Sequence, residues 1–479
     1  MKQYFKKIIV SLDLYNLFTL LAKFHEIYVI NPLRFFYFRT SSVPEHIADS
    51  SEYTLPLPAT NFITSGVTRK TIYFLIHCFY PFSQGGTERF VYNMARQAKN
   101  DGHRVKIITY NALESRRHFK NAVAGILFDE YQIDGLDVIE YRHRKAPRGI
   151  LHDMITDDPD VADFAQFLFD RERPDIVHAA YIQKVASFLA ACRTQGIPYG
   201  ITFTSFFCLC HYDILIDQKG ALCGGSRQGY QCSQVCQCLE IPDPVARHHK
   251  MQQLLQDAAF LTAPSFFVKK VISQEFANIE IEVINHGISR EFSDGTQAPT
   301  ANHAEIKNFA FFGNLTPIKG VHVLIAAFKV MPSDCTLHIY GSGPESYLRR
   351  LRKLINGQKN IILHGRVQYN EMKQAYAANQ VIVVPSIWYE TYNFVIHEAL
   401  LMNKLVIAAR IGAMPEIIRN GVNGLTFSPG DQLDLQRCLQ RVLDPNFAPG
   451  LSKSCTINTI EQESGCYYNI YESVLQEAT

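Results

Sequence analysis

The sequence has little excess charge of either sign and no long apolar run. Its 47 Lys and Arg residues nearly balance its 45 Asp and Glu residues, so the formal net charge is +2. A chain without a broad basic field is not expected to bind nucleic acid. A membrane-spanning helix needs about 20 apolar residues in a row, and the sequence has no such run. Nucleic-acid binders and proteins with a spanning helix are therefore disfavoured.

The cysteines also argue against a secreted disulfide scaffold, which would spread them over a short chain. Six of the twelve cysteines fall between Cys208 and Cys238, and others, such as Cys78 and Cys335, stand singly in apolar surroundings. This distribution predicts a reducing compartment with one local cysteine cluster. The protein is therefore expected to be cytoplasmic.

Residues 1–68 form an extension that ends in a polar linker. Lys2, Lys6 and Lys7 precede a short charge-free run at residues 14–22. One interpretation is an amphipathic helix at a membrane surface, with the lysines near anionic lipid at its inner face. The alternatives are a helix packed on the main domain, or a cleaved signal peptide.

The rest of the chain, 47% apolar and 19% charged over 479 residues in all, has ordinary globular composition. A β-rich run begins at Thr71, a Gly-bearing turn precedes a helical stretch at residues 87–100, and another buried strand follows. Strand–helix–strand in this order predicts a parallel sheet, and a second such series opens near Phe309.

The predicted fold is therefore α/β, with two Rossmann-like domains that face each other across a cleft. The N-terminal domain is expected at residues 69–288, with a cysteine-rich insertion at 205–240, and the C-terminal domain at 289–450. A helix in residues 451–479 is expected to pack back on the N-terminal domain. Open α/β sheets bind ligands at the carboxyl ends of their strands, so the cleft should hold the substrates.

The strongest site motif is VVPSIWYETYNFVIHEALLMN, a buried strand followed by a loop and a helix. Glu390 lies in the loop and Glu398 in the helix, with seven residues between them. The first carboxylate can reach a sugar in the cleft, and the second can accept hydrogen bonds from a ribose diol. The helix N-terminus near Asn393 offers free backbone N–H groups to a diphosphate.

Three glycine-bearing turns follow other predicted strands. In FFGNLTPIKG, Gly313 allows close backbone approach and Lys319 can neutralise a leaving diphosphate. In IYGSGPE, Gly341 and Gly343 form a tight turn beside the expected pocket. In QGGTE, Gly86 leaves room for phosphate at a helix start. Each turn alone is weak evidence, and for Lys319 taken alone an ordinary turn is the favoured interpretation.

In this order, the motifs resemble those of retaining glycosyltransferases of family 4, which have the GT-B fold. The similarity covers about residues 70–450 and includes GGTERFVYNMARQAKNDGHRV, HGRV, IGAMPEII and NGVNGL. It implies transfer of a sugar from a nucleotide-sugar (UDP- or GDP-) to a saccharide or lipid-linked acceptor. It also implies a role in surface polysaccharide or glycolipid biosynthesis.

The resemblance further implies roles for individual residues. Glu390 would hold donor-sugar hydroxyls, Glu398 the ribose and Lys319 the diphosphate, with Glu390 and Lys319 as the catalytic pair. Backbone N–H groups of Asn393 and Phe394 would cap the diphosphate. The implied donor-binding set is Gly86, Gly313, Asn314, Lys319, Gly341, Gly343, Glu390, Asn393, Phe394 and Glu398. No obligatory divalent metal is expected, because Lys319 and the helix dipole offset the developing charge.

The sequence departs from the family at three places. Asn314 stands where an Arg is usual, and Asn393 stands where Gly is frequent. On the acceptor side, His178 and Thr204 are the candidate residues, although Ala180 stands where a second His is common. Front-face attack, in which the leaving phosphate accepts the acceptor's proton, would make a missing base tolerable.

Some family members carry a four-cysteine insertion at the place of the cysteine cluster. Zinc prefers four sulfur or nitrogen ligands in a tetrahedron, and a structural zinc site is one interpretation. Reduced thiols are the equal alternative, and a disulfide would require export. The predicted ligands are Cys210, Cys223, Cys232 and Cys236, with Cys208, His211 and Cys238 as alternates.

Two other functions fit the same fold. A catalytically silent GT-B scaffold protein is the lesser alternative, and the departures at Asn314 and Ala180 are compatible with it. A GT-B sugar-nucleotide epimerase is disfavoured by the intact pair of Glu390 and Glu398.

Overall fold

The computed structural model describes residues 68–477, except Phe82, residues 111–118, 146–156, 237–242, 293–305, Pro445 and residues 448–456. The expected amphipathic segment with Lys2, Lys6 and Lys7 lies outside the described residues. No helix in the described part of the chain is long and apolar enough to cross a membrane.

The N-terminal half is built on a nine-stranded sheet with the order β3-β4-β5-β2-β1-β6-β7-β8-β9. Its apolar runs, such as TIYFLI, are typical of strands covered on both faces, and five of the six residues of β1 are buried. Strands β5, β2, β1 and β6–β9, which are consecutive in this order, run parallel to one another, as predicted. The strands are β1 (Thr71–Ile76), β2 (Arg104–Tyr110), β3 (Asn121–Val123), β4 (Ile126–Ile133), β5 (Leu136–His143), β6 (Ile176–Ala179), β7 (Tyr199–Thr202), β8 (Phe260–Ala263) and β9 (Glu282–Val283).

An antiparallel hairpin at one edge of this sheet was not predicted. Strands β4 and β5 pair antiparallel, and Asp134 and Gly135 form the turn with positive φ angles of 50° and 77°. A two-residue Asp-Gly turn between alternating strands is the usual signal for such a hairpin. The sequence therefore carried the information for this element.

The helices of the N-terminal half connect these strands. Asp158 and Asp243 accept hydrogen bonds from the free N–H groups at the starts of α5 and α8, each of which has a Pro in its first turn. The helices are α4 (Gly86–Asn100), α5 (Pro159–Arg171), α6 (Ala186–Thr194), α7 (Tyr230–Val235), α8 (Pro244–Gln256), α9 (Phe266–Glu275) and the 3₁₀ turn η4 (Arg290–Phe292).

The C-terminal half contains a six-stranded sheet with the order β12-β11-β10-β13-β14-β15. All its neighbouring strands are parallel, as the second strand–helix series predicts. The strands are β10 (Asn308–Phe312), β11 (Thr336–Tyr340), β12 (Ile361–Gly365), β13 (Val381–Val384), β14 (Leu405–Ala409) and β15 (Leu425–Phe427). The helices are η6 (Pro317–Lys319), α10 (Val321–Phe328), α11 (Glu345–Ile355), α12 (Tyr369–Ala377), α13 (Phe394–Leu401), α14 (Met414–Ile417) and α15 (Gln432–Arg441).

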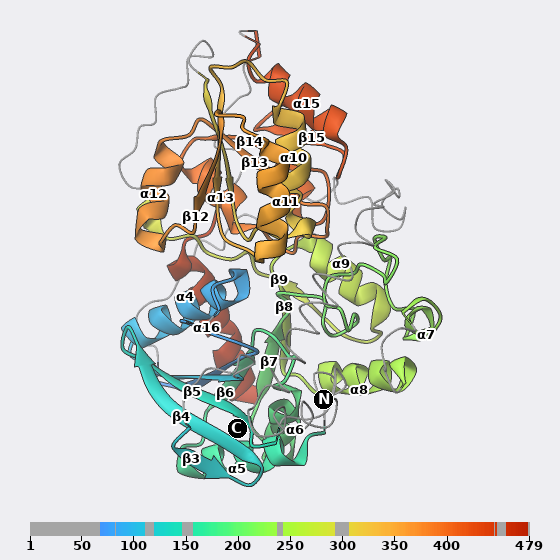
Figure 1. The fold of residues 1–479 in the computed structure, drawn as a ribbon. Helices are drawn as coiled ribbons and strands as arrows, with labels where there is room; N and C mark the ends of the chain where they lie inside the picture. Colours follow the sequence, from blue (N-terminus) through green and yellow to red (C-terminus); the bar gives the residue numbers. More distant parts are fainter. Residues whose placement is uncertain are drawn as a thin grey trace, which may run out of the picture.

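The last helix, α16 (Ile460–Glu477), returns to the N-terminal half and lies beside α4 (Figure 1). The hydroxyl of Tyr467 lies 2.9 Å from Oγ1 of Thr202 on β7. Glu463 accepts a hydrogen bond of 2.7 Å from the backbone N–H of Gly287, which lies between the two sheets in the sequence. The chain therefore crosses between its halves twice, after β9 and before α16.

Candidate active site

The carboxyl ends of two strands of the C-terminal sheet carry three of the predicted donor-site glycines. Gly313 follows β10 and Gly341 follows β11, with φ angles of 144° and 149°. A Cβ atom on Gly341 would lie 1.8 Å from the carbonyl oxygen of Gly313, and one on Gly343 would lie 1.9 Å from that of Leu315. The two loops thus pack backbone against backbone, which requires glycine. Loop packing explains these glycines, while contact with a phosphate stays a prediction.

Glu390 lies buried in the loop after β13, and three donors converge on one of its oxygens. Nζ of Lys319 lies 2.7 Å from Oε1, and the indole N–H of Trp388 lies 2.9 Å from the same atom. The hydroxyl of Ser386 also donates to Oε1. The carbonyl oxygen of Glu390 accepts a 2.8 Å hydrogen bond from Ala413, which fixes the loop. The structure therefore brings the two predicted catalytic residues into direct contact.

Glu398 faces inward from α13 and is fully buried. Its Oε1 forms an ion pair with the guanidinium group of Arg89, on α4 of the other half. Its Oε2 accepts a 2.7 Å hydrogen bond from the hydroxyl of Tyr376, whose ring stacks on Phe312 at 4.2 Å. Glu398 therefore does not lie on a solvent-exposed face of its helix, which was the alternative to a role in the site.

The N-terminus of α13 begins at Asn393, which has a φ angle of 77°. This left-handed conformation is strained for most side chains, but Gly and Asn adopt it. It explains why Asn is acceptable where the family often has Gly. The side chain of Asn393 caps the helix by accepting a 3.2 Å hydrogen bond from the N–H of Ile396. A Cβ on Gly86 would lie 3.6 Å from the Phe394 ring, so the Gly-Gly turn lies against this helix start.

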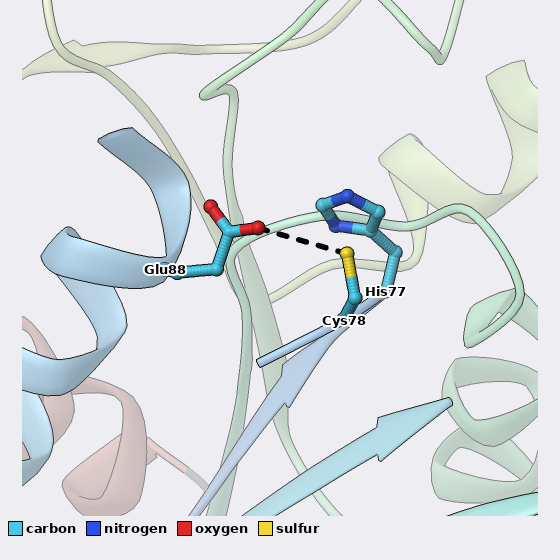
Figure 2. Close-up of side chains that lie close together, drawn as sticks. All are labelled: His77, Cys78 and Glu88. Carbon is cyan, nitrogen blue, oxygen red and sulfur yellow. Dashed lines mark hydrogen bonds between the residues drawn. The ribbon is translucent and has the colours of Figure 1, made fainter. Parts of the chain in front are cut away.

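Glu88 organises the Gly-Gly turn before α4. Its Oε2 accepts a 2.9 Å hydrogen bond from the N–H of Gly85, and its Oε1 accepts from the hydroxyl of Ser83. Figure 2 shows Glu88 beside Cys78, whose sulfur lies 3.6 Å from Oε1, and beside His77. Burial and the Glu88 carboxylate raise the pKa of the Cys78 thiol to about 12. Glu88 thus holds the turn through neutral donors.

The acceptor-side candidate Thr204 lies where the halves meet. Its hydroxyl lies 2.9 Å from that of Thr87 and donates a 2.6 Å hydrogen bond to the carbonyl oxygen of Ala180. Its own carbonyl oxygen accepts a 3.1 Å hydrogen bond from Thr391, the residue after Glu390. Thr204 therefore links the loop after β7 to both the Gly-Gly turn and the Glu390 loop.

His178 lies in the core and not on the acceptor side where the resemblance placed it. It is fully buried on β6, and its two ring nitrogens lie 2.7 Å from the hydroxyl of Tyr471 and 2.6 Å from Oγ1 of Thr202. Burial lowers the pKa of His178 to about 3, so the ring is neutral at physiological pH. The physical reason for the correction is that α16 covers this strand, which places the imidazole between two elements.

The four predicted zinc ligands lie in one region around α7, but they are not gathered at ligand distance. Among the described residues, the clusters with three ligand atoms within 4.8 Å of one another are His77–Cys78–Glu88 and His143–Asp158–Asp160. The predicted zinc site therefore stays a prediction. Burial raises the pKa of Cys223 to about 11 and those of Cys210 and Cys232 to about 12.

A buried cation lies beside these sulfur atoms. Arg247 on α8 donates hydrogen bonds to the carbonyl oxygens of Phe207 and of Cys208, the latter at 3.1 Å. It lines a cavity with Cys208, His211, Cys232 and His248. Thiolates at Cys208, Cys210 and Cys232 would stabilise its positive charge, which burial disfavours. The cluster therefore has a charge partner for metal-bound sulfur.

Sequence reasoning missed several residues that contact the site. Arg89 lies in the motif GGTERF, but no role was predicted for it from the sequence. Ser386 and Trp388 lie within the same motif as Glu390 and could have been assigned as its donors. Glu416, in IGAMPEII, accepts hydrogen bonds from the backbone N–H groups of Phe266 and Phe267 at the start of α9, across the two halves. Contacts of this last kind have no signal in local sequence.

Comparison with solved structures defines the fold class. Anabaena HepE in complex with UDP and glucose superposes with a TM-score of 0.56 at 18% identity, covering 85% of this chain and 98% of that chain. Sucrose-phosphate synthase from Thermosynechococcus elongatus gives a TM-score of 0.59 at 17% identity, and the match covers 85% of this chain and 97% of that chain. These neighbours have the GT-B fold, and this chain has the same fold.

Family models identify the sequence family. The model described as Glycosyltransferase Family 4 matches residues 84–292, and the model described as Glycosyl transferases group 1 matches residues 306–445. Both models describe glycosyltransferases, and together they match most of the chain. The chain therefore belongs to the GT-B glycosyltransferases.

Curated relatives match over shorter segments. A sulfoquinovosyl transferase of Arabidopsis thaliana is 34% identical over 134 residues, which are 27% of this chain and 25% of that protein. A D-inositol 3-phosphate glycosyltransferase of Mycolicibacterium smegmatis is 24% identical over 222 residues, which are 43% of this chain and 50% of that protein. The matched segments thus span a quarter to half of these relatives.

Proposed function

We propose that the protein is a retaining glycosyltransferase that transfers a sugar from a UDP- or GDP-sugar to a saccharide or lipid-linked acceptor. The product would belong to surface polysaccharide or glycolipid biosynthesis. The observation that carries the proposal is the convergence of Lys319, Ser386 and Trp388 on Glu390, beside the N-terminus of α13. The relatives named as sulfoquinovosyl and inositol phosphate glycosyltransferases, and the Anabaena protein solved with UDP-glucose, support the same class of chemistry.

The arrangement around Glu390 supports its role as a ligand of the donor sugar. All three donors contact Oε1, which leaves the lone pairs of Oε2 for sugar hydroxyls. A carboxylate fixed by three donors needs no reorganisation when the sugar binds. We therefore assign hydroxyl recognition to Oε2 of Glu390.

Charge develops on the diphosphate as the glycosidic bond breaks, and two features of the site offset it. The ammonium group of Lys319 is partly exposed, so it can reach a ligand beside Glu390. The helix α13 begins directly after the Glu390 loop, so the backbone N–H groups of Asn393 and Phe394 lie at the positive end of its dipole. Through these groups the chain itself stabilises the leaving diphosphate, and no divalent metal is required in this step.

Retention follows if the acceptor attacks the face that the diphosphate leaves. The acceptor oxygen forms a bond to the anomeric carbon while the bond to the phosphate oxygen breaks, and the acceptor's proton passes to that phosphate oxygen. This route needs no protein base at the acceptor side. It agrees with the burial of His178 and with the structural hydrogen bonds of Thr204.

Release of nucleoside diphosphate tests the proposal. Wild-type protein with UDP-glucose, UDP-galactose or GDP-mannose should release UDP or GDP, and Glu390→Gln should lower the rate at least about 100-fold. Glu345→Gln is the matched control, because this glutamate pairs with Arg352 on the surface of α11. Equal rates for Glu390→Gln and the control would overturn the assignment of the site.

We also propose that the four-cysteine region holds one structural zinc ion and that residues 1–68 attach the protein peripherally to the inner face of a membrane. The buried cation Arg247 supports the first, because bound thiolates would offset its charge. The lysines near the N-terminus support the second. Co-sedimentation with anionic vesicles should be lost when the chain begins at Val67, and unchanged sedimentation would contradict the membrane role.

A further inference from the structure

Arg89 reaches from the N-terminal half into the predicted donor site of the C-terminal half. It lies in the first turn of α4. Figure 1 shows this helix at the edge of the N-terminal half that faces the C-terminal half. One of its guanidinium nitrogens is paired with Oε1 of Glu398. Of the two neighbours in the motif, Glu88 therefore fixes its own turn and Arg89 contacts the opposite domain.

The ion pair sets the charge balance of a fully buried carboxylate. Within the part of the chain that the structure describes, Arg89 is the cation paired with Glu398, and the side chain of Glu398 has no exposed surface. A carboxylate removed from water needs a cation or several hydrogen bonds to stay ionised at low cost. Tyr376 supplies one neutral hydrogen bond at 2.7 Å, so Arg89 supplies the charge.

The guanidinium group is held in place by two aromatic rings. Its central carbon lies 4.8 Å from the centre of the Phe394 ring and 6.0 Å from that of Phe292. Stacking on an aromatic face suits the planar guanidinium group better than an ammonium group. The orientation of Glu398 is thus set by a rigid cation and a tyrosine, one on each carboxylate oxygen.

This arrangement leaves acceptor capacity for a diol. A carboxylate has about four lone-pair sites, two on each oxygen. Arg89 uses one site on Oε1 and Tyr376 uses one on Oε2. One site therefore remains on each oxygen. Because the side chain of Glu398 has no exposed surface, neighbouring side chains must shift before the two hydroxyls of a ribose reach these sites.

We propose that Arg89 is a positioning residue for nucleoside recognition, which acts through Glu398 from the opposite domain. The inference rests on the proposed function, since it assumes that Glu398 binds the donor ribose. Its consequence is that the ribose site is complete only while the two halves are in contact. Affinity for the nucleoside part of the donor then depends on a residue of the half that is expected to bind the acceptor.

The test compares nucleoside diphosphates with inorganic pyrophosphate, which has the two phosphates but no ribose. UDP, GDP and inorganic pyrophosphate are titrated into wild-type protein and into Arg89→Ala, and binding is measured by calorimetry. Losing a charged hydrogen-bond partner of a ligand group should weaken the better-binding nucleotide about tenfold or more. Pyrophosphate binding should change less than about twofold, because the proposal has Arg89 act on the ribose through Glu398 and not on the phosphates. Equal losses for both probes, or no loss for either, would overturn the proposal.

Two further variants separate positioning from folding. Arg96→Ala is the matched control, because Arg96 is an exposed arginine on the same helix. Arg89→Lys keeps the charge without the planar group and should recover part of the nucleotide affinity. In Glu398→Gln, the additional substitution Arg89→Ala should have little further effect, and a full additional loss would show that Arg89 acts elsewhere.

The outcome also distinguishes this inference from the function on which it rests. If wild-type protein binds neither nucleotide nor pyrophosphate, the proposed function fails and the role of Arg89 falls with it. If wild-type protein binds a nucleotide and Arg89→Ala binds it equally well, only the inference about Arg89 is wrong.

Discussion

Removing the positive charge of Lys319 should destabilise the loop that carries Glu390. The ammonium nitrogen lies 2.7 Å from Oε1 of Glu390, and the two side chains are 23% and 6% exposed. Lys319→Met keeps a long apolar stem but leaves the carboxylate with two neutral donors, Ser386 and Trp388. The loss of unfolding free energy in this variant therefore measures the destabilisation caused by a buried carboxylate that has no cation beside it.

The size of the effect follows from the geometry. Two unit charges about 4 Å apart attract each other by about 4 kcal/mol at an effective dielectric constant of about 20, and breaking a buried pair costs about 3–5 kcal/mol. Lys319 is partly exposed, so solvent screens the pair, and we expect Lys319→Met to lower the free energy of unfolding by about 2 kcal/mol. In Lys319→Met/Glu390→Gln no buried charge remains. The double variant should therefore lose about 1–2 kcal/mol less than the sum of the single losses.

The chain provides its own reporter for this measurement. Trp388 is the one tryptophan in the sequence, and Lys319 lies 5.1 Å from its ring centre. Urea unfolding followed by tryptophan fluorescence therefore reports on this loop. Lys353→Met, an exposed lysine on α11, is the control and should be near neutral. Single losses that add within about 0.5 kcal/mol would show that Lys319 and Glu390 do not interact energetically.

Three further predictions concern other parts of the molecule. Burial raises the pKa of Glu416 to about 7 from its usual value of 4.5, so the stability that its protonated form contributes is lost as pH rises from about 4.5 through 7. The free energy of unfolding in urea, measured for wild type and for Glu416→Gln, should therefore change differently with pH. The wild-type value minus the variant value should fall by about 3 kcal/mol at most over this window. A flat difference would contradict that pKa. Burial lowers the pKa of His178 to about 3, so its contribution to stability is lost as pH falls from about 6.5 toward 3; His178→Gln should destabilise the protein by about 1–3 kcal/mol at pH 7 and leave the KM for the donor unchanged. If His178→Gln raised the KM for the donor and left stability unchanged, His178 would belong to the active site and not to the core. Metal analysis of protein purified without added zinc should find one zinc per chain, lost in Cys232→Ser, whereas freely titratable thiols at Cys210, Cys223, Cys232 and Cys236 would reject the site.

Local patterns were sufficient to predict the two parallel sheets and the neighbourhood of Glu390. Strands covered on both faces read as apolar runs, and the carboxyl ends of neighbouring parallel strands meet at one edge. Lys319 and Glu390 follow β10 and β13, which are adjacent in the sheet, so their contact is a consequence of strand order. The edge hairpin of β4 and β5 was predictable from its Asp-Gly turn and was missed.

Contacts between distant segments were not predictable in this way. Arg89 and Glu398 are 309 positions apart, and their pairing depends on how the two halves are placed. His178 was assigned to the acceptor side because the family it resembles commonly has a His there. The sequence does not reveal that α16 returns to cover the strand that carries His178 and places Tyr471 against the imidazole.

Nucleotide binding followed by the fluorescence of Trp388 tests the central claim most directly, because this residue contacts Glu390. Titration of wild-type protein with UDP-glucose, UDP-galactose, GDP-mannose and UDP or GDP alone should give a saturable change for at least one nucleotide-sugar. Glu390→Gln should bind that nucleotide-sugar more weakly, and bind the nucleoside diphosphate alone with nearly unchanged affinity. The account would be contradicted if no nucleotide changed the fluorescence, or if Glu390→Gln weakened both ligands equally.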